Sequence, residues 1–425
     1  MKIINPHNVI ETRRDLHSHP EVGFTEFRTA SKIVETLKGL GYEVTYGDDA
    51  LDIESRRGVP SETELEAAYQ RALQDGANPA ILEKMRGGYT AVIGILKGNA
   101  VGPTIAFRFD IDALPIKESQ DPEHFPQING FGSKYEGYMH ACAHDGHTAI
   151  GLELARKMSD QDFSGTLKLI FQPAEEAGRG AYSIVQKGIV DDVDKIFCLH
   201  LGLGVPLGEI CGGSKDVLAN TRLKAEFYGV PSHSGISPEK GRNALLGAST
   251  ALLNIHAIPR FGNSTTRVNV GVLEGGTAPN IVPEYAKMII ETRAVLSEVN
   301  KELEKRVRNI IAHSAAMHEL EYKIEIIGEG TTMECDDELI SITLEEANKV
   351  EGFHSFKEHY SFGASEDASF LIQRVQQLGG KGTYMVIGTP LAAPHHHQQF
   401  DIDERVLPIS AMLVERIARR TLSNS

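Results

Sequence analysis

Two hydrophobic patterns alternate along most of the chain. Short apolar runs bounded by Gly, Pro or polar residues predict β-strands at residues 90–98, 104–112, 165–173, 194–202 and 382–390. Helical periodicity lies between them, for example in residues 148–158, where the apolar side chains recur near a period of 3.6. This alternation predicts an α/β fold with a mostly parallel sheet flanked by helices.

Residues 216–330 follow a different order. They read as strand, helix, two strands, helix and strand, which is the β-α-β-β-α-β order of a ferredoxin-like unit. We therefore predict that an α+β domain at 216–330 is inserted into a domain made of residues 1–215 and 331–425. A chain of 425 residues is too long for one ordinary core, which also favours two domains.

Residues 51–88 look like a helical insertion in the first domain. Within it, residues 61–85 show helical periodicity, and Ser61 and Glu64 have the spacing of a capping box at the start of a helix.

Composition narrows the classes of function. Apolar residues make up 41% of the chain, charged residues 24%, and no apolar run is long enough to span a bilayer. The first residues do not resemble a secretory signal, so we expect a soluble cytoplasmic protein. A net charge of -15 argues against nucleic-acid and anionic-membrane partners. The four scattered cysteines do not form the disulfide framework of a small secreted domain.

Reactive side chains gather at the predicted ends of strands. They are Asp110, Asp112, Glu175, Glu176, His200, His395, His396 and His397, together with Cys142 and His144 in the turn MHACAHDGHTA before a predicted helix. Ligands of open α/β sheets bind beyond the carboxyl ends of the strands, so these side chains are expected to converge.

Such a set is typical of a site for zinc, manganese or cobalt, because these ions accept thiolate, imidazole and carboxylate ligands together. The five best candidates are Cys142, His144, Glu176, His200 and His396, which suit two neighbouring ions that share ligands. Glu175 and Glu176 are neighbours that leave a strand, so their side chains point in divergent directions, and one can bind a metal while the other acts as a general base.

Each residue also has an ordinary explanation. Taken alone, His200 could be a core or surface residue, Asp110 and Asp112 could be turn residues or caps, and the three adjacent histidines could be a solvated loop. Cys142 could be a small buried side chain, and a catalytic thiol fits less well because the carboxylate pair has no role in it. The shared position at strand ends favours the metal site.

Ten ordered motifs resemble the aminoacylase, hippurate hydrolase and amidohydrolase family of metallopeptidases. The motifs are RRDLHSHPEVGFTEFRTA (13–30), FRFDIDALPI (107–116), MHACAHDGHTA (139–149), LIFQPAEEAGRGA (169–181), FCLHLG (197–202), VPSHSGISPEKGRNAL (230–245), GGTAPNIVP (275–283), ETRA (291–294), SEDAS (365–369) and PHHHQQFDIDE (394–404). Together they span nearly the whole chain.

The resemblance implies a catalytic domain with two metal ions, manganese or zinc, and a smaller lid domain that also forms a dimer. It assigns Cys142, His144, Glu176, His200 and His396 as ligands, and Glu175 as the base. His396 is chosen because it stands four residues before Phe400; His395 and His397 remain open. The implied lid residues are His233, which reaches toward the oxyanion, often from the neighbouring subunit, and Asn280 and Arg293, which bind the substrate carboxylate. Arg293 could instead be a strand residue in a surface ion pair.

The implied reaction is hydrolysis of the amide bond of an N-acyl amino acid. The insertion and the segments VPLG (205–208), GIVDDVD (188–194) and SEDAS are most similar to the branch that cleaves p-aminobenzoyl-glutamate. Indole-acetyl-aspartate, hippurate and N-acetyl-amino acids are the alternatives, and the partner is either a second copy or a paralogous subunit. Another interpretation is a binding subunit with little activity of its own.

Three departures from the family pattern affect the site. Ala143 replaces a usual Gly, VPSHSG replaces a usual Ala-Ala-His-Ala around His233, and PHHHQQF replaces a His-Asn-Pro pattern. Asp145 and His147 are expected to support the ligands or to start the helix.

Overall fold

The computed structural model describes residues 9–423. The chain forms two compact units. The large unit contains the chain up to Lys215, then Met333–Phe362 and everything from Asp367 onward, whereas the small unit contains Asp216–Thr332 and Gly363–Glu366. Among the described residues, no helix is both long and apolar enough to cross a membrane.

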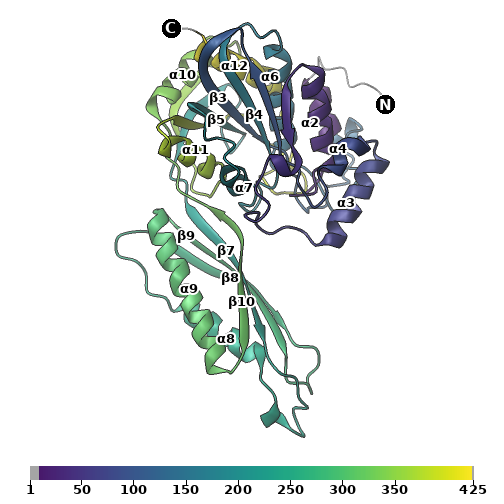
Figure 1. The fold of residues 1–425 in the computed structure, drawn as a ribbon, viewed down its shortest axis with the longest axis vertical. Coiled ribbons are helices and arrows are strands. Elements are labelled where there is room, and N and C mark those ends of the chain that lie inside the picture. The colour runs from purple at the N-terminus through teal and green to yellow at the C-terminus, as the bar shows by residue number, and fades with distance from the viewer. Residues whose placement is uncertain (1–8, 424–425) are drawn as a thin grey trace. The chain divides into compact units, whose positions relative to one another are not determined.

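An eight-stranded sheet forms the centre of the large unit (Figure 1). In spatial order its strands are β1 (Glu43–Tyr46), β2 (Val92–Lys97), β4 (Ser164–Gln172), β3 (Ala100–Asp110), β5 (Lys195–Leu201), β12 (Lys381–Ile387), β6 (Glu209–Lys215) and β11 (Ser355–Ser361). The central neighbours β4, β3, β5 and β12 are parallel. The predicted α/β class with a mostly parallel sheet is confirmed.

One predicted strand is antiparallel, and three further strands were not predicted. Strand β2 pairs antiparallel with both β1 and β4. Strands β1, β6 and β11 were not predicted, because the first is short, the second contains two glycines and the third is largely polar, so none of them forms an apolar run.

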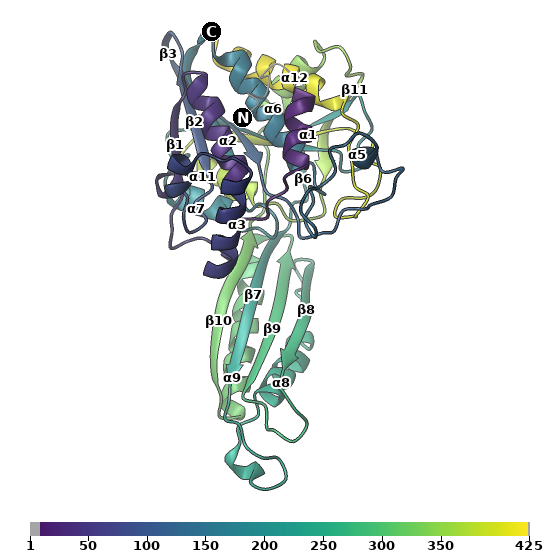
Figure 2. The same cartoon turned by 90° about the vertical axis from the view of Figure 1, so that its right-hand side faces the viewer.

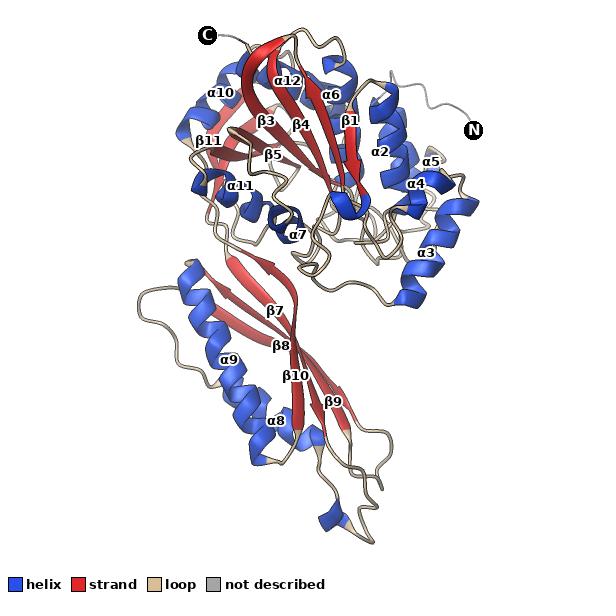
Figure 3. Cartoon of the chain, viewed as in Figure 1, coloured by secondary structure: helices blue, strands red, loops and turns tan. Residues whose placement is uncertain are grey.

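Helices cover the sheet (Figures 2 and 3). Helix α6 contacts α1, α2 and α12 as well as strand β3, whereas α11 contacts α7 and strands β5 and β12. The helices of this unit are α1 (Val9–His17), α2 (Phe27–Gly39), α3 (Glu62–Gln74), α4 (Pro79–Glu83), α5 (Phe125–Ile128), α6 (His144–Met158), α7 (Ala181–Gln186), α10 (Asp337–Ala347), α11 (Ala368–Gln377) and α12 (Val406–Thr421). The core includes stacked rings from the strands, such as Phe107 and Phe197, whose centroids are 5.2 Å apart.

The small unit has the predicted β-α-β-β-α-β order. Its elements are β7 (Ala219–Tyr228), α8 (Ala244–His256), β8 (Thr266–Gly275), β9 (Tyr285–Ala294), α9 (Ser297–Met317) and β10 (Glu321–Gly330), and the antiparallel sheet has the order β10-β7-β9-β8. Both helices contribute to a core with the alternate, buried residues of β7 and β9. The opposite face of the sheet is not covered by these helices. The lid and dimerisation role remains a prediction.

Two local predictions are informative. The Ser61 side chain accepts a hydrogen bond from the Glu64 backbone N, and the Glu64 carboxylate accepts one from the Ser61 backbone N, so the predicted capping box is present at the start of α3. Helix α6 begins at His144 rather than near residue 148. The histidines His144 and His147 of the HACAHDGH segment therefore belong to the first turns of the helix.

Candidate metal centre

Parallel strands bring the reactive side chains of the large unit together. Asp110 is opposite Gln172 at the ends of β3 and β4, and His200 is opposite Val386 on β5 and β12. The loop with Glu175 and Glu176 follows β4, and the histidine loop follows β12. The reactive side chains therefore converge at the carboxyl edge of the sheet, as predicted.

Two groups of possible metal ligands share the thiol of Cys142. One contains Cys142, His144 and Glu176, and the other contains Cys142, His200 and His395; within each group the candidate ligand atoms lie within 4.8 Å of one another. The Cys142 Sγ atom is 3.5 Å from His200 Nε2. Atoms that bind a tetrahedral ion at about 2.0–2.3 Å lie roughly 3.3–3.8 Å apart, so this spacing suits a shared ion.

The first group contains polar atoms that require a partner. His144 Nε2 and Glu176 Oε1 are buried, and neither has a hydrogen-bond partner among the described residues. Buried polar atoms of this kind are rare and costly unless an ion or water satisfies them. The donor set therefore fits a divalent cation.

Backbone carbonyls orient two of the imidazoles. His144 Nδ1 is 2.9 Å from the Asp112 carbonyl oxygen, and His200 Nδ1 is 2.8 Å from the Leu201 carbonyl oxygen. A carbonyl only accepts, so each Nδ1 carries the hydrogen and each Nε2 presents its lone pair, as a metal ligand must. Burial lowers the pKa of His144, but Asp110 and the hydrogen bond to Asp112 outweigh burial and raise that pKa well above 6.5. A bound cation would displace this proton.

His147 is engaged at both ring nitrogens. Its Nε2 accepts a hydrogen bond of 3.0 Å from the Leu201 backbone N, so its Nδ1 carries the hydrogen that is donated over 2.5 Å to Asp110 Oδ1. Arg108 Nη1 donates to the other oxygen of Asp110 at 2.7 Å. His147 therefore links helix α6 to the ends of β3 and β5, in agreement with the expected supporting role.

Three carboxylates hold the loop that carries Glu175 and Glu176. Asp112 accepts hydrogen bonds of 3.0 Å from the backbone N of both residues. Glu26 accepts one of 2.8 Å from Ala174, and Asp367 accepts one of 2.9 Å from Ala181. Glu175 Oε2 lies 3.8 Å from His144 Nε2, so Glu175 stands beside the first ligand group.

Sequence patterns did not identify Glu26, Arg108 or Asp367 as supporting residues. Glu26 is fully buried, and burial together with Asp112 raises its pKa to about 8. A charged residue next to an apolar helix is ordinarily solvated, so nothing in its local pattern signalled this contact.

The histidine loop offers two candidates. His395 Nδ1 is 3.5 Å from Cys142 Sγ, but its Nε2 accepts a hydrogen bond of 3.2 Å from the Leu203 backbone N, so Nδ1 carries a hydrogen. His396 Nε2 is 3.3 Å from Glu176 Oε1, a spacing that suits two ligands of one ion. The neighbouring Cys142 thiol and Glu176 carboxylate raise the pKa of His396 to about 10. His397 is exposed, and its Nδ1 accepts from the Gln399 backbone N.

Burial and the nearby Glu176 raise the pKa of the Cys142 thiol above its usual value. A nucleophilic cysteine requires the opposite shift, because the thiolate is the reactive form. The surroundings of Cys142 thus favour a metal ligand over a catalytic thiol.

The residue between Cys142 and His144 has an unusual backbone. Ala143 has φ 67° and ψ 12°, the left-handed conformation that glycine adopts most easily. This conformation gives a reason for the glycine that the family usually has here. Although alanine stands here in place of glycine, the side chains of Cys142 and His144 still belong to one ligand group.

The predicted lid residues do not lie together in the small unit. His233 forms a β-bridge with Ile281, and the Ser234 backbone N donates to the Asn280 carbonyl, so His233 and Asn280 are neighbours at the end of the sheet where β9 begins. Arg293 is at the other end of β9, roughly 26 Å from the first residue of that strand at about 3.3 Å per residue. Arg293 also forms an ion pair with Glu291 at 2.8 Å, which is the alternative role that the sequence left open for it.

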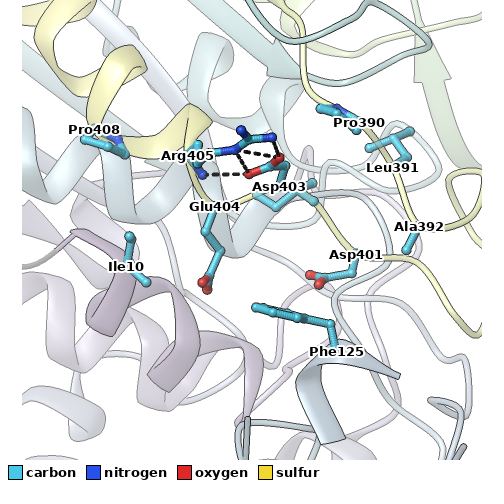
Figure 4. A pocket seen from close by; sticks show the side chains of 11 residues that line it. Ile10, Phe125, Pro390, Leu391, Ala392, Asp401, Asp403, Glu404, Arg405 and Pro408 are labelled. Atoms are coloured by element: carbon cyan, nitrogen blue, oxygen red, sulfur yellow. Dashed lines mark hydrogen bonds and ion pairs between the residues drawn. The ribbon is translucent and has the colours of Figure 1, made fainter. Parts of the chain in front are cut away.

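A separate cavity of about 850 Å³ in the large unit is lined by none of the candidate ligands (Figure 4). Its lining is largely apolar, with Ile10, Phe125 and Leu391 among the side chains. The carboxylates of Asp401 and Glu404 beside it bind Arg13. These two carboxylates are therefore engaged in ion pairs within the protein, and the cavity is not part of the candidate metal centre.

Comparisons with known proteins match nearly the whole length of the chain. The model of a protein family described as "Peptidase family M20/M25/M40" matches residues 106–420. Indole-3-acetyl-aspartic acid hydrolase of Enterobacter agglomerans is 44% identical, and one of the named subunits of p-aminobenzoyl-glutamate hydrolase of Escherichia coli is 41% identical; each alignment covers 97% of this chain and 94% of the relative. The crystal structure of an aminobenzoyl-glutamate utilization protein from Klebsiella pneumoniae is 37% identical, has a TM-score of 0.85 and covers 97% of this chain and 95% of its own.

Proposed function

Because the chain belongs to peptidase family M20/M25/M40, we propose that it is a metal-dependent amidohydrolase that cleaves p-aminobenzoyl-glutamate into p-aminobenzoate and glutamate. The observation that carries this proposal is the cluster of possible metal ligands around Cys142, with His200, Glu176 and His396 at ligand spacing and Glu175 next to it. Release of p-aminobenzoate and glutamate would place the enzyme in folate breakdown.

The residues that would hold the ions are Cys142, His144, Glu176, His200 and His396. Two divalent ions, manganese or zinc, would lower the pKa of the attacking water and polarise the carbonyl of the scissile amide. His396 is preferred over His395 because the Leu203 backbone N already occupies the second ring nitrogen of His395, which leaves a hydrogen on the atom facing Cys142.

The remaining chemistry is assigned to side chains of the protein. Glu175 takes a proton from the attacking water as the water oxygen bonds to the carbonyl carbon, and it passes that proton to the amine nitrogen as the C–N bond breaks. His233 donates a hydrogen bond to the oxyanion. Asn280 and Arg293 bind the substrate carboxylate, for which the planar and permanently charged guanidinium of Arg293 is well suited.

The test compares two adjacent carboxylates. Glu175→Gln is expected to lower kcat on p-aminobenzoyl-glutamate by about 10²–10⁴-fold, because it removes the proton acceptor, and to keep its metal. Glu176→Gln is the matched control and is expected to lower the metal content as well. Turnover with added manganese or zinc, together with the bound metal by elemental analysis, gives both readouts. Equal rates for wild type and Glu175→Gln would remove Glu175 from the chemistry.

A second candidate substrate is indole-acetyl-aspartate. The relative that is 44% identical is named for this compound, and both named substrates are amides of an acidic amino acid. Hippurate and N-acetyl-amino acids complete the panel. Comparing kcat/KM across these compounds identifies the acyl group, and a higher value for indole-acetyl-aspartate would replace the primary assignment.

We also propose that the chain works as a dimer, with a second copy or with a paralogous subunit. The relative from Escherichia coli is named as one subunit of its hydrolase, which supports a partner. Running the substrate panel with and without a co-expressed paralogue distinguishes an enzyme that is active alone from a subunit that binds metal yet needs its partner.

A further inference from the structure

The uncovered face of the small unit's sheet carries a cluster of arginines at the end where Arg293 lies. Arg267 on β8 is directly opposite Arg293 on β9, and Arg222 on β7 is directly opposite Glu291 on β9. Residues 291 and 293 are two apart on one strand, so all four side chains are on the same face. These three arginines and one glutamate leave a surplus of two positive charges, although the whole chain is strongly acidic.

Glu291 neutralises only part of the positive charge of this cluster. Its carboxylate accepts two hydrogen bonds from Arg293, at 2.8 and 3.0 Å, and another from Arg222 at 2.9 Å. Arg267 is exposed, and its guanidinium donates to the Thr266 carbonyl oxygen at 3.2 Å; no ion pair joins it to any residue within the described range 9–423.

Two like charges directly opposite each other in an antiparallel pair are destabilising. The juxtaposition of Arg267 and Arg293 therefore costs stability in the free protein, and an anion bound between them would relieve that repulsion. Both side chains line one cavity of about 230 Å³, together with Leu218, Thr265, Ala294 and Gly363. Since a water molecule takes about 30 Å³ of liquid, this space holds several waters or a small carboxylate-bearing group.

Building on the proposed function, we infer that Arg267 determines specificity by binding the side-chain carboxylate of an N-acyl glutamate or aspartate, while Arg293 binds the α-carboxylate. The Cβ atoms of directly paired residues are about 5 Å apart, and the two carboxylates of an acidic amino acid are only a few bonds apart. One guanidinium is thus placed for each carboxylate, that of Arg293 being shared with Glu291, and the surplus of two charges matches the charge of the ligand. A neutral amino acid would leave Arg267 without a counterion.

The test uses a pair of compounds that differ only in the charge of the amino-acid side chain. The ratio of kcat/KM for p-aminobenzoyl-glutamate to that for p-aminobenzoyl-glutamine is measured in wild type and in Arg267→Gln. We expect the ratio to fall by about 10- to 100-fold in the variant, because a charge-assisted hydrogen-bonded pair is lost from the charged compound alone. Arg267→Lys should restore part of the ratio, since it keeps the charge but not the planar fork.

Arg260→Gln is the matched control, because Arg260 is an exposed arginine of the same unit and lies outside the cluster. It should keep the wild-type ratio. Calorimetric binding of the two compounds to the metal-loaded protein repeats the comparison without turnover. Hydrolysis of both compounds with the same ratio in wild type and Arg267→Gln would overturn the role of Arg267 and leave the proposed function intact. An unreactive wild type that still binds the glutamate compound through Arg267 would overturn only the proposed reaction.

Discussion

At the scale of single residues, the site depends on how each side chain is oriented by its neighbours. His144 and His200 each donate from Nδ1 to a backbone carbonyl, so both present Nε2 toward the Cys142 groups. His147 has the same chemistry and lies on the same helix as His144, yet Leu201 and Asp110 occupy both of its nitrogens. Any of these histidines could bind a metal by its chemistry. Whether it is available depends on whether its second ring nitrogen is already engaged in a hydrogen bond.

A buried charge network near the start of α6 predicts a pH-dependent stability. His17 lies 2.8 Å from Asp145 and 3.0 Å from Glu118, while Arg13 also binds Asp145. Burial and Arg13 lower the pKa of His17, but the hydrogen bonds to the two carboxylates outweigh them and raise it to about 9.

Because the folded pKa of His17 exceeds its ordinary value, its contribution to stability is fully present below about pH 6.5 and is lost as pH rises through about 9. The shift corresponds to roughly 3 kcal/mol at most. His17→Gln is expected to unfold more easily than wild type at pH 6, and the difference should shrink by pH 9.5. Urea unfolding at several pH values measures it. His313→Gln, at an exposed histidine, is the control, and a difference for His17→Gln that stayed constant with pH would contradict this charge assignment.

At the scale of elements, helix α6 fixes the centre of the site. Its start at His144 follows the left-handed Ala143, which separates the two candidate ligands Cys142 and His144. The periodicity of apolar side chains located the helix but missed its first turn, because His144, Asp145 and His147 are polar and nevertheless fully buried. A polar first turn is read as a loop unless its partners on β3 and β5 are known.

The capping box gives a prediction confined to one element. Ser61 is exposed, and its hydrogen bonds with Glu64 satisfy the first turn of α3. Ser61→Ala is expected to lower the free energy of unfolding by about 1 kcal/mol, because it leaves a backbone N–H of the helix start without its acceptor. Denaturant unfolding measures the loss. Turnover should not change; a large loss of activity would mean that α3 also serves the site.

At the scale of the whole molecule, the lid residues suggest that one active site draws on two chains. His233 and Asn280 are at one end of the small unit's sheet and Arg293 is at the other, so a single copy of this unit does not present them together. In a symmetric dimer, the same surface is used by both copies, and His233 of one copy can serve the site of the other.

Mixing two inactive variants tests this arrangement. If His233 acts across the dimer, a mixed dimer of Glu175→Gln and His233→Ala contains one intact site, formed by Glu175 of one chain and His233 of the other. Random pairing at equal amounts should restore about a quarter of the wild-type rate. Each variant alone should stay inactive, which is the control. No recovery after unfolding and refolding the mixture, with wild type recovering under the same conditions, would place His233 and Glu175 in the same chain's site.

Local patterns along the chain were enough to predict the fold class, the β-α-β-β-α-β order of the small unit, the capping box and the set of residues at the strand ends. These features follow from local periodicity, helix-start chemistry and the rule that ligands bind at the carboxyl edge of a parallel sheet, so neighbours along the chain suffice to predict them. Resemblance between ordered motifs supplied the family.

The packing of distant segments shows which candidate residues are placed as metal ligands and which support them. It joined two ligand groups through Cys142, engaged His147 and one nitrogen of His395 in backbone hydrogen bonds, placed Glu26 and Asp367 under the Glu175 loop, and set Arg267 opposite Arg293. Each of these contacts is between residues that are distant in the sequence, and it is made by a hydrogen bond, a strand register or a shared cavity. No local pattern of residues records them, because they arise only when the strands and helices pack.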